Sequence, residues 1–95
     1  MEDVNFDTRS ALVIDDSEVH RQIICSMLEN VGFAQIYFAN DGNEGIAMTE
    51  SCKPDVVICD LRMEPANGFE YLRLLRASPD PQMQQTPVIV ASGLN

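Results

Sequence analysis

Three apolar runs in this sequence end on side chains that carry oxygen. Asp15 and Asp16 follow the first run, Asp60 follows the second, and Ser92 follows the third. Short β-branched runs without polar alternation are typical of strands that are covered on both faces of a parallel sheet. Such sheets bind ligands beyond the carboxyl ends of their strands, where the strand order reverses. We therefore expect three carboxylates and a hydroxyl to meet at one edge of a sheet.

Three carboxylates at one point repel each other unless a cation lies among them or one of them takes up a proton. Oxygen ligands without Cys or His favour a hard ion, Mg²⁺ or Mn²⁺ before Zn²⁺. Mg²⁺ retains water and takes one or two protein carboxylates, which leaves positions for a phosphoryl oxygen. Aspartate is also a nucleophile toward phosphorus. The pattern predicts metal-assisted phosphoryl chemistry at Asp15, Asp16 and Asp60.

The elements that must position these groups alternate along the chain. Strands are expected over residues 11–14, 35–39, 56–59 and 88–91, with helices from the N-cap Ser17 to Gly32, over roughly 43–52, and after Gly68. The apolar stripes of these helices are Val19, Ile23, Met27, Leu28 and Val31 in the first, Ile46, Ala47 and Met48 in the second, and Phe69, Leu72 and Leu75 in the third. Residues 78–87 contain three prolines and are expected to be a surface connection.

This alternation predicts an α/β fold of the doubly wound class, because crossovers between parallel strands are right-handed. With the strands ordered 2-1-3-4, the ends of the first and third strands lie side by side. Asp15, Asp16 and Asp60 would then converge at the switch point of the sheet.

Composition narrows the class of protein. The 95 residues suffice for one domain, which we expect over residues 11–95 after a polar lead-in over 1–10. A net charge of −9 argues against direct binding of nucleic acid. Three cysteines without CxxC spacing indicate neither disulfides nor zinc, and no apolar stretch reaches membrane-spanning length. We expect a cytoplasmic protein without membrane contact.

The motifs, taken in order, resemble the receiver domain of two-component response regulators. They are Asp15-Asp16-Ser17, Ala39-Asn40-Asp41-Gly42, Asp60-Leu61-Arg62-Met63-Glu64-Pro65, Gly68, and the run from Pro87 to Ser92-Gly93. The resemblance implies a flavodoxin-like sheet. It also implies that Asp60 accepts a phosphoryl group from a phosphohistidine on a sensor histidine kinase or phosphotransfer protein.

The same resemblance implies roles for the neighbouring residues. Asp15, Asp16 and Asp60 would bind Mg²⁺ together with the backbone carbonyl of Arg62, and Ser92 would contact the phosphoryl group. Receivers have a further helix, a fifth strand ending in Lys, and a last helix, whereas this sequence stops three residues after Ser92. We therefore expect a receiver that lacks its last strand and helices. Its fourth strand would be an exposed edge that pairs with a second copy.

Two other functions stay open. A pseudo-receiver would use the fold for protein association without phosphorylation. An aspartyl-phosphate phosphatase would need an acid two residues after Asp60, where the sequence has Arg62. Simpler interpretations also exist for single residues: Asp15-Asp16-Ser17 as a helix cap, Ser92 as a turn residue, and His20 as a solvated or half-covered side chain.

Overall fold

The computed structural model of the protein describes residues 9–60 and 68–91. Along the chain its elements are β1 (Ser10–Ile14), α1 (Glu18–Val31), β2 (Gln35–Ala39), α2 (Gly42–Cys52), β3 (Val56–Cys59), α3 (Gly68–Arg76), α4 (Pro81–Gln84) and β4 (Val88–Val90). The four predicted strands and three predicted helices are confirmed to within one or two residues. None of the helices in the described ranges is long and apolar enough to cross a membrane.

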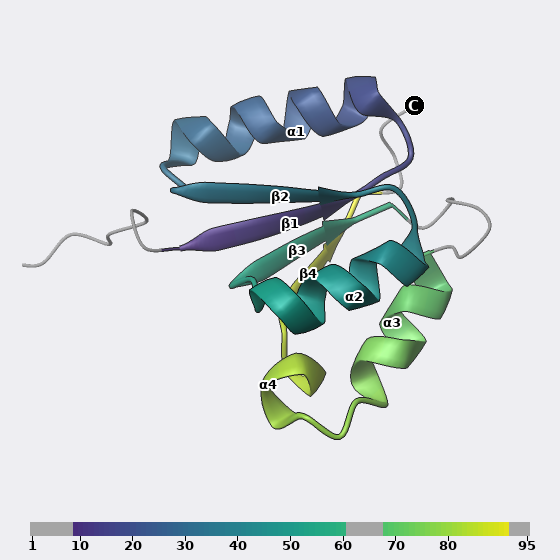
Figure 1. Ribbon diagram of the computed structural model, residues 1–95. Helices are drawn as coiled ribbons and strands as arrows, with labels where there is room; N and C mark the ends of the chain where they lie inside the picture. The colour runs from purple at the N-terminus through teal and green to yellow at the C-terminus, as the bar shows by residue number, and fades with distance from the viewer. Residues whose placement is uncertain (1–8, 61–67, 92–95) are drawn as a thin grey trace, which may run out of the picture.

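The strands form one parallel sheet in the order β2-β1-β3-β4, as predicted. Helix α1 covers one face of this sheet, and α2, α3 and α4 lie on the other face (Figure 1). Ile14, the last residue of β1, pairs with Ala39 of β2 on one side and with Cys59 of β3 on the other. The switch point of the sheet therefore lies directly beyond Ile14.

The core consists of two apolar layers, one on each face of the sheet. Successive side chains of each strand point alternately into one layer and the other. One layer contains Leu12, Ile14, Val57, Cys59, Tyr71 and Leu75, and the other contains Ala11, Val13, Ile24, Leu28 and Ile58. Because both faces are covered, the strands read as continuous apolar runs in the sequence. Each large side chain that is fully removed from water contributes about 1.5–3 kcal/mol.

Helix α1 is oriented differently from what its most regular apolar stripe indicates. Its N-cap Ser17 accepts a hydrogen bond from the backbone of His20, and Gly32 ends it in the left-handed conformation with φ 110°. The residues buried against the sheet are Ile24 and Leu28. The rest of the predicted stripe, Val19, Ile23, Met27 and Val31, is more than half exposed.

Helix α2 buries small residues rather than its apolar ones. Gly42, Gly45 and Thr49 face the core, while Ile46 and Met48 are only partly buried and Ala47 is exposed. At Gly45 the helix approaches β1 so closely that a Cβ atom would lie 2.6 Å from Ile14 Cδ1. The absence of a side chain at Gly45 therefore allows this close packing.

Helix α3 buries Gly68, Tyr71 and Leu75, and Leu72 packs at the margin of the core. The prediction that Phe69 shares the buried face is wrong, because its side chain is 64% exposed. Tyr71 and Leu75, four residues apart, form the line that meets the sheet. The phenol of Tyr71 can be buried because Thr49 provides a hydrogen-bond partner.

The connection over residues 78–87 contains the one-turn helix α4, which the sequence pattern did not predict. Asp80 caps this helix, and Pro81 occupies its first turn. The hydrogen bond from the backbone of Gln82 and the nearby ammonium group of Lys53, 3.2 Å away, lower the pKa of Asp80. Arg76 of α3 donates to the backbone oxygens of Gln84 and Thr86, which ties α3 to this segment.

Candidate functional site

The ends of β1 and β3 bring Asp15 and Asp60 to the same edge of the sheet. The backbone N–H of Asp60 donates to the oxygen of Ile14, and the N–H of Asp15 donates to the oxygen of Ala39, both at 3.0 Å. These ladder hydrogen bonds continue past the strands and fix the two aspartates side by side. Their exposed fractions are only 1% for Asp15 and 7% for Asp60.

His20 joins these two aspartates. One ligand atom from each of Asp15, His20 and Asp60 lies within 4.8 Å of the other two. The imidazole Nδ1 of His20 is 3.4 Å from Oδ2 of Asp15. His20 stands in the first turn of α1, where its backbone N–H donates to the Ser17 hydroxyl at 3.2 Å.

From the sequence we expect His20 to be solvated or half-covered, and the side chain is 23% exposed. Its proximity to the acidic edge was missed. The signal that could have found it is the N-cap at Ser17. A residue three positions after an N-cap lies in the first turn, close to the strand end that the helix follows.

The carboxylate of Asp15 is only partly satisfied by the protein. Its Oδ1 accepts a hydrogen bond from the Ser17 N–H at 2.9 Å, whereas its Oδ2 is buried without a hydrogen-bond partner, as is Nδ1 of His20. Arg21 donates instead to the backbone oxygen of Asp15, at 2.7 Å, and to Asn40. Burying a carboxylate oxygen without a partner is costly, and a cation between two carboxylates removes that cost. The donor set therefore fits a divalent cation.

The other predicted site residues are Asp16, Arg62 and Ser92, of which the structure describes only Asp16. Asp16 is exposed beside Asp15, outside the group of three side chains. Arg62 and Ser92 lie outside the described residues, so their roles stay predictions. The N–H of Ala91 donates to the oxygen of Cys59 at 3.0 Å, which extends the pairing of β4 to the residue before Asp60.

Comparison with known proteins assigns this arrangement to a family. Residues 11–95 match the model of the response regulator receiver domain. The chain is a member of this family. As a receiver it belongs to the proteins of two-component signalling, in which magnesium and phosphorylation are general features.

Two relatives show how the receiver compares with full-length proteins. It is 44% identical over 85 residues to protein-glutamate methylesterase/protein-glutamine glutaminase 1 of Myxococcus xanthus, covering 87% of this chain and 23% of that protein. It is 36% identical over 81 residues to Protein PilH of Pseudomonas aeruginosa, covering 85% and 64%. The chain thus spans less than two thirds of the length of each.

Solved structures share the same fold. The N-terminal domain of a response regulator receiver protein from Methanoculleus marisnigri has a TM-score of 0.78 at 31% identity, covering 87% of this chain and 65% of that one. The chemotaxis response regulator CheY4 of Vibrio cholerae has a TM-score of 0.77 at 30% identity, covering 86% and 66%. The likeness confirms the predicted flavodoxin-like sheet.

Cys59, beside the receiver's acidic edge, is a poor candidate for nucleophile or metal ligand. Burial raises the pKa of Cys59 to about 12, and the nearby charges of Asp60 and Asp15 act in the same direction. A thiol with this pKa stays protonated at neutral pH, and only the thiolate is a strong nucleophile or metal ligand. The candidate groups at this edge are therefore the carboxylates of Asp15 and Asp60 and the imidazole of His20.

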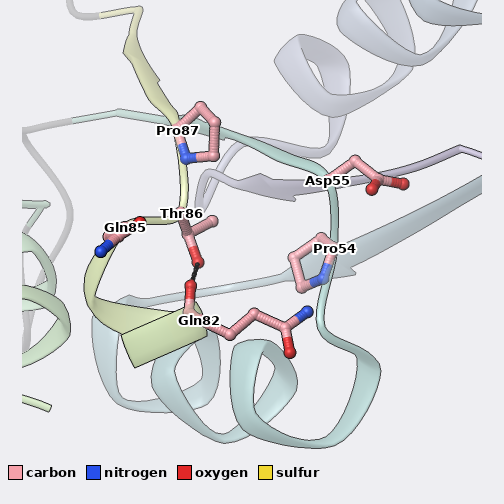
Figure 2. A pocket seen from close by; sticks show the side chains of 6 residues that line it. All are labelled: Pro54, Asp55, Gln82, Gln85, Thr86 and Pro87. Atoms are coloured by element: carbon pink, nitrogen blue, oxygen red, sulfur yellow. Dashed lines mark hydrogen bonds between the residues drawn. The ribbon is translucent and has the colours of Figure 1, made fainter. Parts of the chain in front are cut away.

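The receiver also has a pocket of about 260 Å³ at the opposite edge of the sheet, shown in Figure 2. It is lined by Pro54, Asp55, Gln82, Gln85, Thr86 and Pro87. Pro54 and Asp55 precede β3, and Thr86 and Pro87 precede β4, so the pocket lies at the amino ends of the strands. The Thr86 hydroxyl donates to the oxygen of Gln82 at 3.0 Å, and Asp55 accepts from the N–H of Ser10 at 2.8 Å. Because these polar groups are already satisfied, the acidic edge is the better candidate site.

Proposed function

We propose that this receiver accepts a phosphoryl group on Asp60 from a phosphohistidine of a sensor histidine kinase or phosphotransfer protein, in a Mg²⁺-dependent reaction. The observation that supports this is the pair of buried carboxylates at the switch point, one of which has an oxygen without a hydrogen-bond partner. The transfer forms one bond and breaks one. A carboxylate oxygen of Asp60 attacks the phosphorus, and the bond from phosphorus to the donor's imidazole nitrogen breaks. Its electron pair stays on that nitrogen, and the donor leaves as neutral histidine because the other ring nitrogen carries a proton.

Different residues of the chain would contribute to different parts of the phosphoryl transfer. The hydrogen bond from Asp60 N–H to Ile14 holds the nucleophile at a defined place, and burial limits access of water to the aspartyl phosphate. Asp15, Asp16, Asp60 and the backbone carbonyl of Arg62 would hold Mg²⁺, which when bound neutralises charge on the transferred phosphoryl oxygens. Ser92 would donate a hydrogen bond to the phosphoryl group. The unit that carries this function is residues 11–95, and a cytoplasmic location stays a prediction of the sequence.

A second candidate is a pseudo-receiver that acts by association. It is favoured by β4, where Ile89 is 55% exposed and Val90 is 44% exposed in a strand at the edge of the sheet. An open edge strand with apolar side chains is a template for pairing with another chain. We propose that this strand also joins two copies of the receiver.

A fluoride salt of beryllium that mimics a bound phosphoryl group tests the first proposal. With Mg²⁺ present, it is expected to shift the amide resonances of Asp60 and Ser92 in the wild type and not in Asp60→Asn. Asp55→Asn is the matched control, because Asp55 lies at the other end of the same strand. Its spectrum should respond like that of the wild type.

Two negative outcomes have different meanings. If Mg²⁺ alone shifts these resonances and the beryllium salt adds nothing, the edge is a metal site without phosphoryl acceptance. If neither reagent changes the spectrum or the stability, phosphorylation is excluded and the association module is the remaining function.

A further inference from the structure

We propose that His20 is a direct ligand of the divalent cation at the acidic edge. This inference rests on the cation site of the proposed function and adds to it a nitrogen donor. Beside the Asp16 and Arg62 ligands of that proposal, the site would then include two buried carboxylates and one imidazole, from Asp15, Asp60 and His20. Such a set binds first-row transition metals such as Mn²⁺, Co²⁺ and Ni²⁺ more tightly, relative to Mg²⁺, than carboxylates alone.

The distances between the three candidate ligand atoms are somewhat longer than those between neighbouring ligands of a bound metal ion. Metal–ligand bonds of about 2.0–2.2 Å place neighbouring ligand atoms of an octahedron roughly 3 Å apart. Asp15 Oδ2 and His20 Nδ1 are separated by 3.4 Å, and no pair in the group of three exceeds 4.8 Å. The Asp15–His20 pair would need to close by only a few tenths of an ångström, and the widest pair of the group by more.

Both facing atoms lack the hydrogen bonds that a purely structural pair would make. Asp15 Oδ2 and His20 Nδ1 are each buried without a hydrogen-bond partner, although they lie near one another. Buried polar atoms without partners are rare, and an ion or a ligand is one established reason for them. A divalent cation between the two atoms satisfies both.

The backbone holds His20 in this place without help from a metal. The Ser17 hydroxyl accepts from the N–H of His20, and the Ser17 N–H donates to Oδ1 of Asp15. The cap of α1 thus connects the imidazole and the carboxylate through one residue. Little ordering is left to occur when a cation binds, which favours affinity.

Pulsed electron paramagnetic resonance of the untagged full chain loaded with Mn²⁺ tests this inference. His20 is the only histidine in the sequence, so an imidazole nitrogen coupled to Mn²⁺ can only come from this side chain. The wild type is expected to show that coupling, and His20→Gln is expected to lose it. Glu18→Gln, an exposed substitution in the same turn, should retain it. Circular dichroism confirms that each variant is folded.

Calorimetric titration gives the second measurement. In His20→Gln we expect the affinity for Co²⁺ or Ni²⁺ to fall by about 10-fold or more, while the affinity for Mg²⁺ changes by less than about 3-fold. In Asp15→Asn both affinities should fall, because an oxygen ligand common to all the ions is lost.

The outcomes separate this inference from the proposed function. If Mn²⁺ binds without nitrogen coupling, His20 is not a ligand, and the cation site of the proposed function stands. If Mn²⁺ does not bind to the wild type, the inference and the cation site are both overturned. A loss of Mg²⁺ and Ni²⁺ affinity by equal factors in His20→Gln would also overturn the inference, because it would show a merely positioning role.

Discussion

The hydroxyl oxygens of Thr49 and Tyr71 lie 2.8 Å apart in the buried interface between α2 and α3. The Thr49 hydroxyl also donates to the backbone oxygen of Gly45 at 2.7 Å. Because a threonine hydroxyl has one proton, Tyr71 must be the donor in the pair. This short chain of hydrogen bonds joins α2 and α3, two of the helices that cover one face of the sheet.

We expect Thr49→Val to destabilise the protein by about 1–3 kcal/mol, since it leaves the buried Tyr71 hydroxyl without an acceptor. Tyr71→Phe should cost less, because Thr49 retains its bond to Gly45. In the double variant no unpaired hydroxyl remains, so its cost should be smaller than the sum of the two single costs. Urea unfolding of the four proteins measures this coupling. Additive costs would contradict the assignment of the hydrogen bond.

Alkaline pH should destabilise the protein through the same tyrosine. Burial raises the pKa of Tyr71 to about 12, from 10.0 for a phenol in water. The unfolded chain therefore loses this proton before the folded protein does, and stability falls as the pH rises from 10 toward 12. The loss amounts to roughly 3 kcal/mol at most, at about 1.4 kcal/mol per pKa unit.

The pH dependence of urea unfolding checks this expectation. Cys59, whose pKa is raised by burial in the same way, contributes with the same sign, so part of the slope remains in Tyr71→Phe. Tyr37→Phe serves as the comparison variant because it removes the hydroxyl of a tyrosine that is only partly buried. An unchanged slope in Tyr71→Phe would show that this phenol is not the titrating group.

Gly45→Ala should destabilise the receiver despite the higher helix propensity of alanine. The new methyl group would lie 2.6 Å from Ile14 Cδ1 and 3.2 Å from Tyr71 Cδ1, both in side chains without exposed surface. Overpacking costs about 1–3 kcal/mol against a propensity gain of about 1 kcal/mol. We expect a net loss of up to roughly 2 kcal/mol in thermal or urea unfolding. Asn43→Ala, exposed on the same helix, should be neutral or slightly stabilising.

The edge strand offers a test of association between two copies. If β4 pairs with a second copy, Ile89→Lys should shift the sedimentation of concentrated protein toward the monomer, because a charge on an edge strand opposes pairing. Ile23→Lys is the matched control, since Ile23 is 51% exposed on α1 and Ile89 is 55% exposed on β4. Association that is lost only in the Ile23 variant would place the contact on α1. A monomeric wild type at high concentration would exclude the dimer.

The strands, their order and the convergence of Asp15 with Asp60 could be predicted from the sequence. Each apolar run is followed by a polar residue. In a parallel sheet the carboxyl ends of the strands lie at the same edge, and this does not depend on which helices cover the faces. The acidic edge can thus be predicted from local sequence patterns of four or five residues. His20 was missed because its contact with Asp15 depends on how the first turn of α1 folds back over β1.

The sequence by itself determined that residues 18–31 form a helix and that residues 56–59 form a buried strand, because apolar periodicity and capping are properties of neighbouring residues. Only the tertiary structure decided that Ile24 and Leu28 face the sheet while Val19 and Ile23 face outward. The physical reason is that this helix has two adjacent rows of apolar side chains, and both rows have helical spacing. The choice between them depends on the shape of a surface built from residues far away in the chain.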